Sequence, residues 1–127
     1  MVGPIVTPMR LLGYCFFTGA GTLLTKSGNM TFSRASTGNY NFQIPAANVV
    51  VPPKDDSELF VFAGVENDDN MPFIGTLAGK NADGSIGVNI KTRITATTGN
   101  GTACDPANMW MSIWQLSKTD VINSGNP

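Results

Sequence analysis

Two short carboxylate clusters, within residues 55–58 and 66–69, are the groups in this chain best suited to chemistry. They could hold Ca²⁺ or act as an acid and base pair on a glycan. Calcium takes about six to eight oxygen ligands, and neither cluster has the spacing of an EF-hand. A glycosidase sets two carboxylates about 5–10 Å apart in a cleft, which spacing along a loop does not establish. Charge runs of this kind are typical of surface connectors. The residues that we expect on outward loops are Asp55, Asp56, Asp68, Asp69 and Asn100.

Histidine is absent from the chain. Its absence removes the commonest general base, the Ser-His-Asp and Cys-His nucleophile systems, and nearly every zinc or iron site. Serine and threonine hydroxyls are plentiful, but no base is present to activate them. We therefore expect a non-enzymatic protein with no catalytic residue, cofactor or metal.

Two cysteines, Cys15 and Cys104, stand far apart in the sequence. If they were paired, the disulfide would close a long loop and contribute on the order of 4 kcal/mol to stability. Their positions are also consistent with two free thiols, one in a strand and one in a loop. Their spacing matches no redox or metal motif. With nothing to indicate an oxidising compartment, free thiols are favoured.

The charge content of the 127 residues is low. Charged residues make up 13% of the chain, against a usual share of about 25%. The basic residues are scattered rather than clustered, so we expect no nucleic-acid partner. No apolar run approaches the ~20 residues of a membrane span, so we expect no membrane insertion. A surface with so little charge favours coverage by further copies of the same chain.

Short apolar segments separated by Gly, Asn and Pro turns predict the elements. Tyr40, Phe42 and Ile44 alternate with polar residues, as in a half-buried strand. No segment has helical periodicity with caps. The pattern predicts an all-β protein, an antiparallel β-sandwich or jelly-roll-like fold of about eight strands within residues 11–117.

Two apolar segments have the clearest consequences. Leu59–Val65 is apolar on both faces, which predicts a central strand between two layers. The closing segment has Trp110 and Trp114 on one face and methionines on the other. Together with Tyr14, these tryptophans are candidates for a subunit interface; they equally suit the interior of a monomer, because aromatic residues are enriched in both.

Both ends of the chain differ from this domain. Residues 1–10 contain two prolines, which cannot supply ladder N–H groups, so we expect an extended arm. Residues 118–127 predict a polar tail. The candidate anchor residues within the arm are Ile5, Val6 and Met9.

The strand and turn motifs resemble those of the small C-terminal β-sandwich domains of tailed-bacteriophage fibres and related virion appendages. The closing strand, from Asp105 to Trp114, is also similar. The residues that carry the resemblance in the first half are Tyr14-x-x-Phe17-x-Gly19-x-Gly21-Thr22, Met30, Phe32 and Ser36-Thr37-Gly38-x-Tyr40-x-Phe42.

The resemblance implies a structural protein at the surface of a virion, forming a homotrimer and contacting other capsid or tail proteins through its arm. The leading expectation is a capsid decoration protein or a fibre-like appendage. A tail-fibre-type receptor-binding protein that attaches to a host receptor or glycan is the alternative. A carbohydrate-binding module that uses Trp110, Trp114 or Tyr14 is the second alternative.

Overall fold

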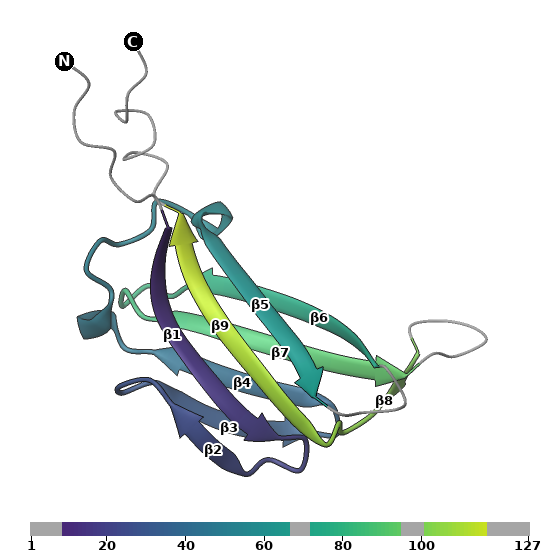
Figure 1. Ribbon diagram of the computed structural model, residues 1–127. Coiled ribbons are helices and arrows are strands. Elements are labelled where there is room, and N and C mark those ends of the chain that lie inside the picture. Colours follow the sequence, from purple (N-terminus) through teal and green to yellow (C-terminus); the bar gives the residue numbers. More distant parts are fainter. Residues whose placement is uncertain (1–8, 67–71, 95–100, 117–127) are drawn as a thin grey trace, which may run out of the picture.

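The computed structural model describes residues 9–66, 72–94 and 101–116, which form two antiparallel β-sheets packed face to face (Figure 1). Sheet A has the strand order β2-β1-β9-β5, and sheet B has the order β3-β4-β7-β6, with β8 pairing with β7. The expected all-β sandwich is confirmed. Sheet A consists of β1 (Met9–Thr18), β2 (Leu23–Lys26), β5 (Leu59–Glu66) and β9 (Asn108–Leu116). Sheet B consists of β3 (Thr31–Ser36), β4 (Asn39–Ile44), β6 (Phe73–Lys80), β7 (Ile86–Ile94) and β8 (Thr102–Ala103).

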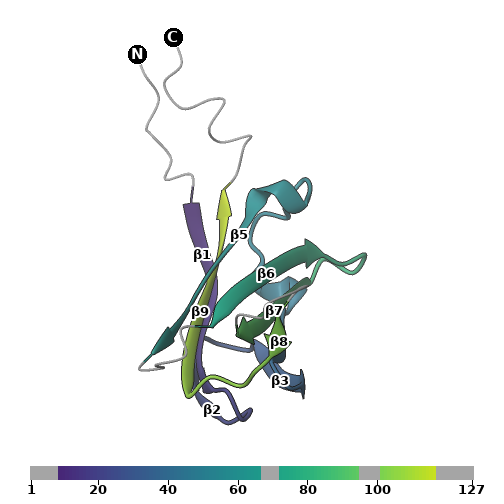
Figure 2. The same ribbon diagram turned by 90° about the vertical axis from the view of Figure 1, so that its right-hand side faces the viewer.

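The described residues contain no α-helix, and two single-turn 3₁₀ helices lie between β4 and β5: η1 (Ala46–Asn48) and η2 (Asp56–Glu58). Figure 2 views the two layers from the side, with β1 and β9 in one layer and β6 and β7 in the other. The strands that begin and end the described part of sheet A, β1 and β9, are neighbours, and Met9 pairs with Leu116. The chain therefore enters and leaves the sandwich at the same end of sheet A.

The core lies between the sheets and is built from alternate positions along the strands. The fully buried ring of Phe17 from β1 packs against sheet B, with its centroid 4.8 Å from Phe32, 5.1 Å from Tyr40 and 5.3 Å from Phe42. Since successive strand residues point to opposite faces, the residues between these positions point outward. Further buried core residues from β4, β7 and β9 are Ile44, Ile86, Val88, Ile90, Met109, Met111 and Ile113.

Strand β5 does not have the central position that its sequence predicts. It is an edge strand of sheet A and pairs only with β9 among the described strands. Its inward residues Leu59 and Val61 contact the core, whereas Phe60 and Phe62 are exposed on the other side. The prediction of a central strand covered on both faces is therefore wrong: one face of β5 contacts the core and the other is exposed.

The expected N-terminal arm is shorter than the sequence indicates. Met9 and Arg10 belong to β1, where they pair with Leu116 and Gln115 of β9. The other anchor candidates, Ile5 and Val6, lie outside the described residues, as does the expected tail at 118–127. Cys15 is buried in β1 and Cys104 lies near β8, and no disulfide joins the two.

Candidate functional site

The outward side of sheet A carries large apolar side chains from β1, β9 and β5. Because the strands are in register, these side chains lie in rows across the sheet. Trp114 lies between Leu11 and Phe60, Ser112 lies between Tyr14 and Phe62, and Trp110 lies between Phe16 and Gly64. We call this surface the aromatic face and define it by Leu11, Tyr14, Phe16, Phe60, Phe62, Trp110 and Trp114.

Two contacts hold the indoles of this face close to the sheet. A Cβ atom built on Gly64 would lie 2.5 Å from the Trp110 ring, so this indole lies directly over the glycine. The indole Nε1–H of Trp114 donates to Ser112 Oγ at 2.9 Å. The glycine and the serine thus leave room for the rings and satisfy an indole donor, and the surface remains apolar.

The aromatic face is exposed and uncharged. Phe62 is 49% exposed, Phe16 43% and Trp110 38%, although each is a large apolar side chain. No charged residue occupies the three rows; Glu66, at the end of β5 opposite Asn108, is at the rim. Contiguous apolar surface on a soluble protein marks a contact with another molecule.

The structure brings together the three residues that the sequence indicates for a subunit interface. Tyr14, Trp110 and Trp114 all lie on the aromatic face, within two neighbouring strands. The sequence reasoning missed Phe60 and Phe62 of β5, which extend the face by another strand. The signal was present: the two-sided apolar pattern of Leu59–Val65 reflects one core face and one exposed aromatic face.

A polar cluster around Asp105 joins the turns at one end of the sandwich. The Asp105 carboxylate accepts hydrogen bonds from the Gly38 backbone N–H at 2.8 Å and from Arg34 Nη2 at 2.6 Å. The Tyr40 hydroxyl lies 3.1 Å from the same carboxylate and 2.8 Å from the carbonyl oxygen of Gly19. Asp105 therefore ties the β8–β9 loop to the β3–β4 turn and, through Tyr40, to the β1–β2 turn.

This cluster shifts the pKa values of its members in opposite directions. Burial, together with the hydrogen bond to Asp105 and its charge, raises the pKa of Tyr40 well above its usual range. Burial acts to raise the pKa of Asp105, but the hydrogen bonds from Arg34, Gly38 and Tyr40 outweigh it and hold that pKa below its ordinary value. The arrangement keeps Tyr40 neutral and Asp105 charged, which suits a structural clamp.

Glycines in the β1–β2 turn and the β3–β4 turn allow close packing at the same end of the sandwich. A Cβ atom on Gly19 would lie 1.7 Å from the Pro106 carbonyl oxygen, so only glycine allows the two backbones to approach. Gly38 has a φ of 64°, in the left-handed region that favours glycine. Gly19 and Gly38 are therefore explained by the packing of the turns.

Each carboxylate of the first cluster accepts a hydrogen bond from within the protein. Asp55 accepts from the Ser57 backbone N–H at 2.8 Å and caps η2, and Asp56 accepts from the Lys80 backbone N–H at 3.0 Å. Glu58 is buried, and its carboxylate accepts from Gln115 Nε2 at 3.4 Å. Asp68, Asp69 and Asn100 lie outside the described residues. Among the residues that the structure describes, no three His, Cys, Asp or Glu side chains gather as metal ligands would.

The fold and the aromatic face define an all-β sandwich with an unpaired apolar sheet surface. No protein-family model, curated protein or solved structure matches the chain. Within 9–66, 72–94 and 101–116, no helix is long and apolar enough to cross a membrane.

Proposed function

We propose that the protein is a non-enzymatic structural protein that assembles with copies of itself through the aromatic face. The observation that carries the proposal is the uncharged surface formed by β1, β9 and β5. Three strands about 4.8 Å apart, with about eight residues at ~3.4 Å each, give a sheet face of roughly 400 Å² before side-chain relief is counted. A stable interface covers about 800 Å² per partner, so in the proposed trimer this face forms the centre of a larger contact with the neighbouring copies.

The chemistry of the face favours another copy of the chain over a sugar. Protein sites for small ligands combine apolar surface with a few polar groups that fix orientation. On the aromatic face, the indole donor of Trp114 already bonds Ser112, and the neighbouring positions carry Leu11, Phe60 and Phe62. Such a surface offers area and few hydrogen bonds. It suits a matching apolar surface and brings no unpaired charge into the interface.

The sequence resemblance supports two further parts of the proposal. One is the setting, which is the surface of a bacteriophage-type virion, and the other is the trimeric state. In this proposal the chain is a decoration or fibre-like protein that contacts capsid or tail neighbours through the residues before β1. A receptor-binding appendage is the alternative in the same setting. The two roles differ in copy number, since decoration proteins cover the particle and appendages are few.

A matched pair of substitutions tests the assembly proposal. Phe62→Ser removes an aromatic ring from the aromatic face, and Phe73→Ser removes an exposed ring from β6, on the outer side of sheet B. A phenylalanine carries about 200 Å² of surface, so covering the exposed half of Phe62 is worth about 2.5 kcal/mol per copy. Light scattering across a concentration series should show dissociation of Phe62→Ser at concentrations where Phe73→Ser stays assembled. Equal behaviour of the two variants contradicts the proposal.

A further inference from the structure

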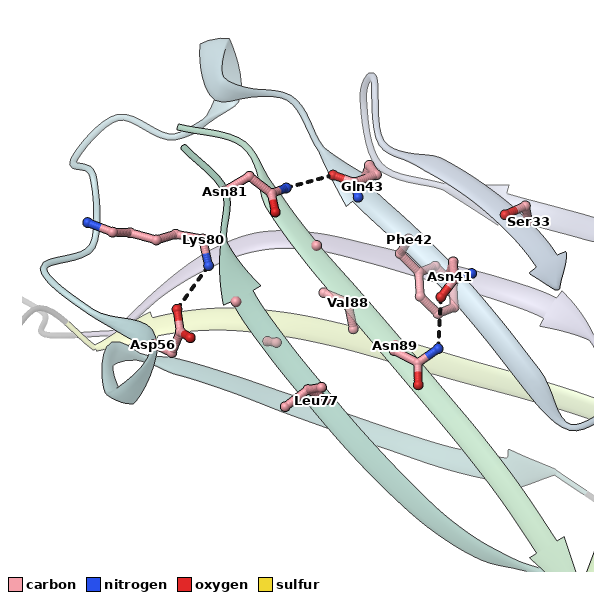
Figure 3. Close-up of a pocket in the computed structure, with 13 residues that line it drawn as sticks. Ser33, Asn41, Phe42, Gln43, Asp56, Leu77, Lys80, Asn81, Val88 and Asn89 are labelled. Carbon is pink, nitrogen blue, oxygen red and sulfur yellow. Dashed lines mark hydrogen bonds between the residues drawn. The ribbon is translucent and has the colours of Figure 1, made fainter. Parts of the chain in front are cut away.

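The outer side of sheet B is hollowed into an open groove of about 540 Å³ (Figure 3). The groove and the aromatic face lie on different sheets, so they are on opposite sides of the sandwich. Amide side chains from β4 and β7 and from the β6–β7 turn line it, among them Asn41, Gln43, Asn81 and Asn89. Gly79 and Gly87, paired directly across β6 and β7, lie at its floor. This surface has the opposite chemistry to the aromatic face.

The amides form two hydrogen-bonded pairs. In one, Asn89 Nδ2 donates to Asn41 Oδ1 at 2.8 Å; in the other, Asn81 Nδ2 donates to Gln43 Oε1 at 3.3 Å (Figure 3). Asn89 and Asn81 are held further by Asn39 Oδ1 at 2.7 Å and Ser85 Oγ at 2.9 Å. These bonds fix the orientation of every amide in the two pairs before a ligand arrives.

Each pair has hydrogen-bonding capacity left over. Within the described residues, no hydrogen bond uses Asn41 Nδ2 or Asn89 Oδ1, nor Gln43 Nε2 or Asn81 Oδ1. Each pair therefore offers one amide donor and one amide acceptor. Asn41 and Gln43 stand two residues apart on β4, so the two pairs are about 7 Å apart along the strand.

The absence of side chains at Gly79 and Gly87 leaves space for the amides close to the sheet. A Cβ atom on Gly87 would lie 3.2 Å from Gln43 Nε2 and 3.8 Å from Asn81 Nδ2. A side chain at this position would therefore push against the second pair and fill the space beside it. Gly79 is similar, since its Cβ atom would lie 3.3 Å from Asp56 Oδ2.

Charge at the groove argues against an anionic ligand. The Lys80 ammonium donates to the carbonyl oxygens of Pro53 at 3.1 Å and Lys54 at 3.2 Å and points away from the amides (Figure 3). The remaining charged group of the lining is the Asp56 carboxylate. Leu77, paired with Asn89 and 72% exposed, adds an apolar surface beside the amides.

We propose that this groove binds a neutral oligosaccharide. Every sugar hydroxyl is both a donor and an acceptor, so neighbouring hydroxyls match the donor–acceptor pairs Asn41–Asn89 and Gln43–Asn81. The C–H side of the sugar packs on Leu77. The site is independent of the aromatic face, so the two proposals fail separately.

The test follows the side-chain amide signals of the full chain by ¹H–¹⁵N NMR. The probes are neutral tetrasaccharides of α- or β-linked glucose, mannose, galactose and N-acetylglucosamine, each at roughly 10 mM to detect a Kd near 1 mM. We expect at least one of them to shift the NH₂ signals of Asn41 and Gln43 in a saturable manner. Gln43→Ala should weaken that binding roughly tenfold, by removing a donor and freeing its partner amide. Asn29→Ala, in the exposed turn before β3, is the matched control and should bind as the wild type does.

Three results would overturn the proposal. The first is that none of the tetrasaccharides shifts these amide signals. The second is that the shifts appear at the indole N–H groups of Trp110 and Trp114, which places the sugar on the aromatic face. The third is that a sulfated tetrasaccharide binds more tightly than every neutral one, which assigns the surface to anions through Lys91 and Arg93, farther along β7.

Discussion

Replacing Gly64 by alanine separates the assembly of the protein from its folding. The Cβ atom would lie 2.5 Å from the Trp110 ring, whereas carbon atoms in contact stay about 3.5 Å or more apart. The indole must therefore move outward by about 1 Å. It is 38% exposed and has room to move, and alanine restricts the unfolded chain more than glycine does, a gain of about 0.4–1 kcal/mol. The stability of the isolated subunit should change by less than about 1 kcal/mol.

The effect on assembly should be larger. A face with one ring of its middle strand displaced outward by ~1 Å no longer matches its partner, and overpacking of this kind costs about 1–3 kcal/mol. The dissociation constant should rise by roughly 5- to 150-fold for each copy that contributes the altered face. Sedimentation equilibrium gives the dissociation constant, and urea unfolding of dilute protein gives the stability. Tryptophan emission, to which Trp110 and Trp114 both contribute, should change as the Trp110 ring is displaced.

Gly75→Ala is the control for this experiment. Gly75 lies on β6, and a Cβ atom there would have no neighbour closer than the Lys91 carbonyl oxygen at 4.0 Å. It makes the same chemical change in a strand of the other sheet and should leave assembly unaltered. If Gly64→Ala assembles as tightly as the wild type, or if Gly75→Ala weakens assembly equally, the aromatic face is not the contact between copies.

Three further predictions concern stability and the chain before β1. Burial raises the pKa of the Cys15 thiol to about 11, although the positive charge of Lys26 acts to lower it. As the pH rises, the thiol therefore loses its proton in the unfolded chain before it does so in the folded protein. The free energy of unfolding should fall by about 2 kcal/mol between pH 9 and 11. Urea unfolding of Cys15→Ala should show a shallower alkaline slope, with the raised pKa of Tyr40 accounting for the decline that remains above pH 10; an unchanged slope contradicts the assignment. Asp105→Asn should cost about 2 kcal/mol at neutral pH through its weakened bonds to Arg34 and Gly38. It should also reduce the loss of stability that the wild type shows below about pH 3.8, with the lowered pKa of Asp83 accounting for part of what remains. A stability within about 0.5 kcal/mol of the wild type would show that the clamp contributes little. In the proposed virion setting, deleting residues 1–8 should leave an assembled sandwich that particles fail to incorporate, measured by co-purification with virions. Incorporation of the shortened chain would exclude the anchor.

Where polar and apolar residues alternate, the sequence alone predicts both the strand and which of its side chains point into the core. Tyr40, Phe42 and Ile44 point inward as expected, because a period of two is a direct consequence of strand geometry. Trp110 and Trp114 likewise lie opposite the buried methionines of β9. These predictions depend only on the alternation of side chains along one strand, which does not change with the way the strands pair.

The position of β5 and the shape of the groove depended on pairing, which local pattern does not contain. A strand that is apolar on both faces has the same pattern whether a second layer or another molecule covers it, so the pattern of Leu59–Val65 alone predicts a central strand. The polar residues of β4 were correctly expected to point outward. Their arrangement with Asn89 and Asn81 is set by the register of β4, β7 and β6, which brings together residues far apart in the sequence.

The most direct test of self-assembly through the aromatic face is hydroxyl-radical footprinting of the full chain over a range of concentrations. Phe62 and Trp110 should be oxidised slowly in concentrated protein and faster on dilution, as copies separate. Phe73 and Leu77, exposed on the other sheet, should be oxidised at a constant rate. Oxidation of Phe62 and Trp110 at a rate independent of concentration, in protein that is shown by sedimentation to assemble, would contradict the account.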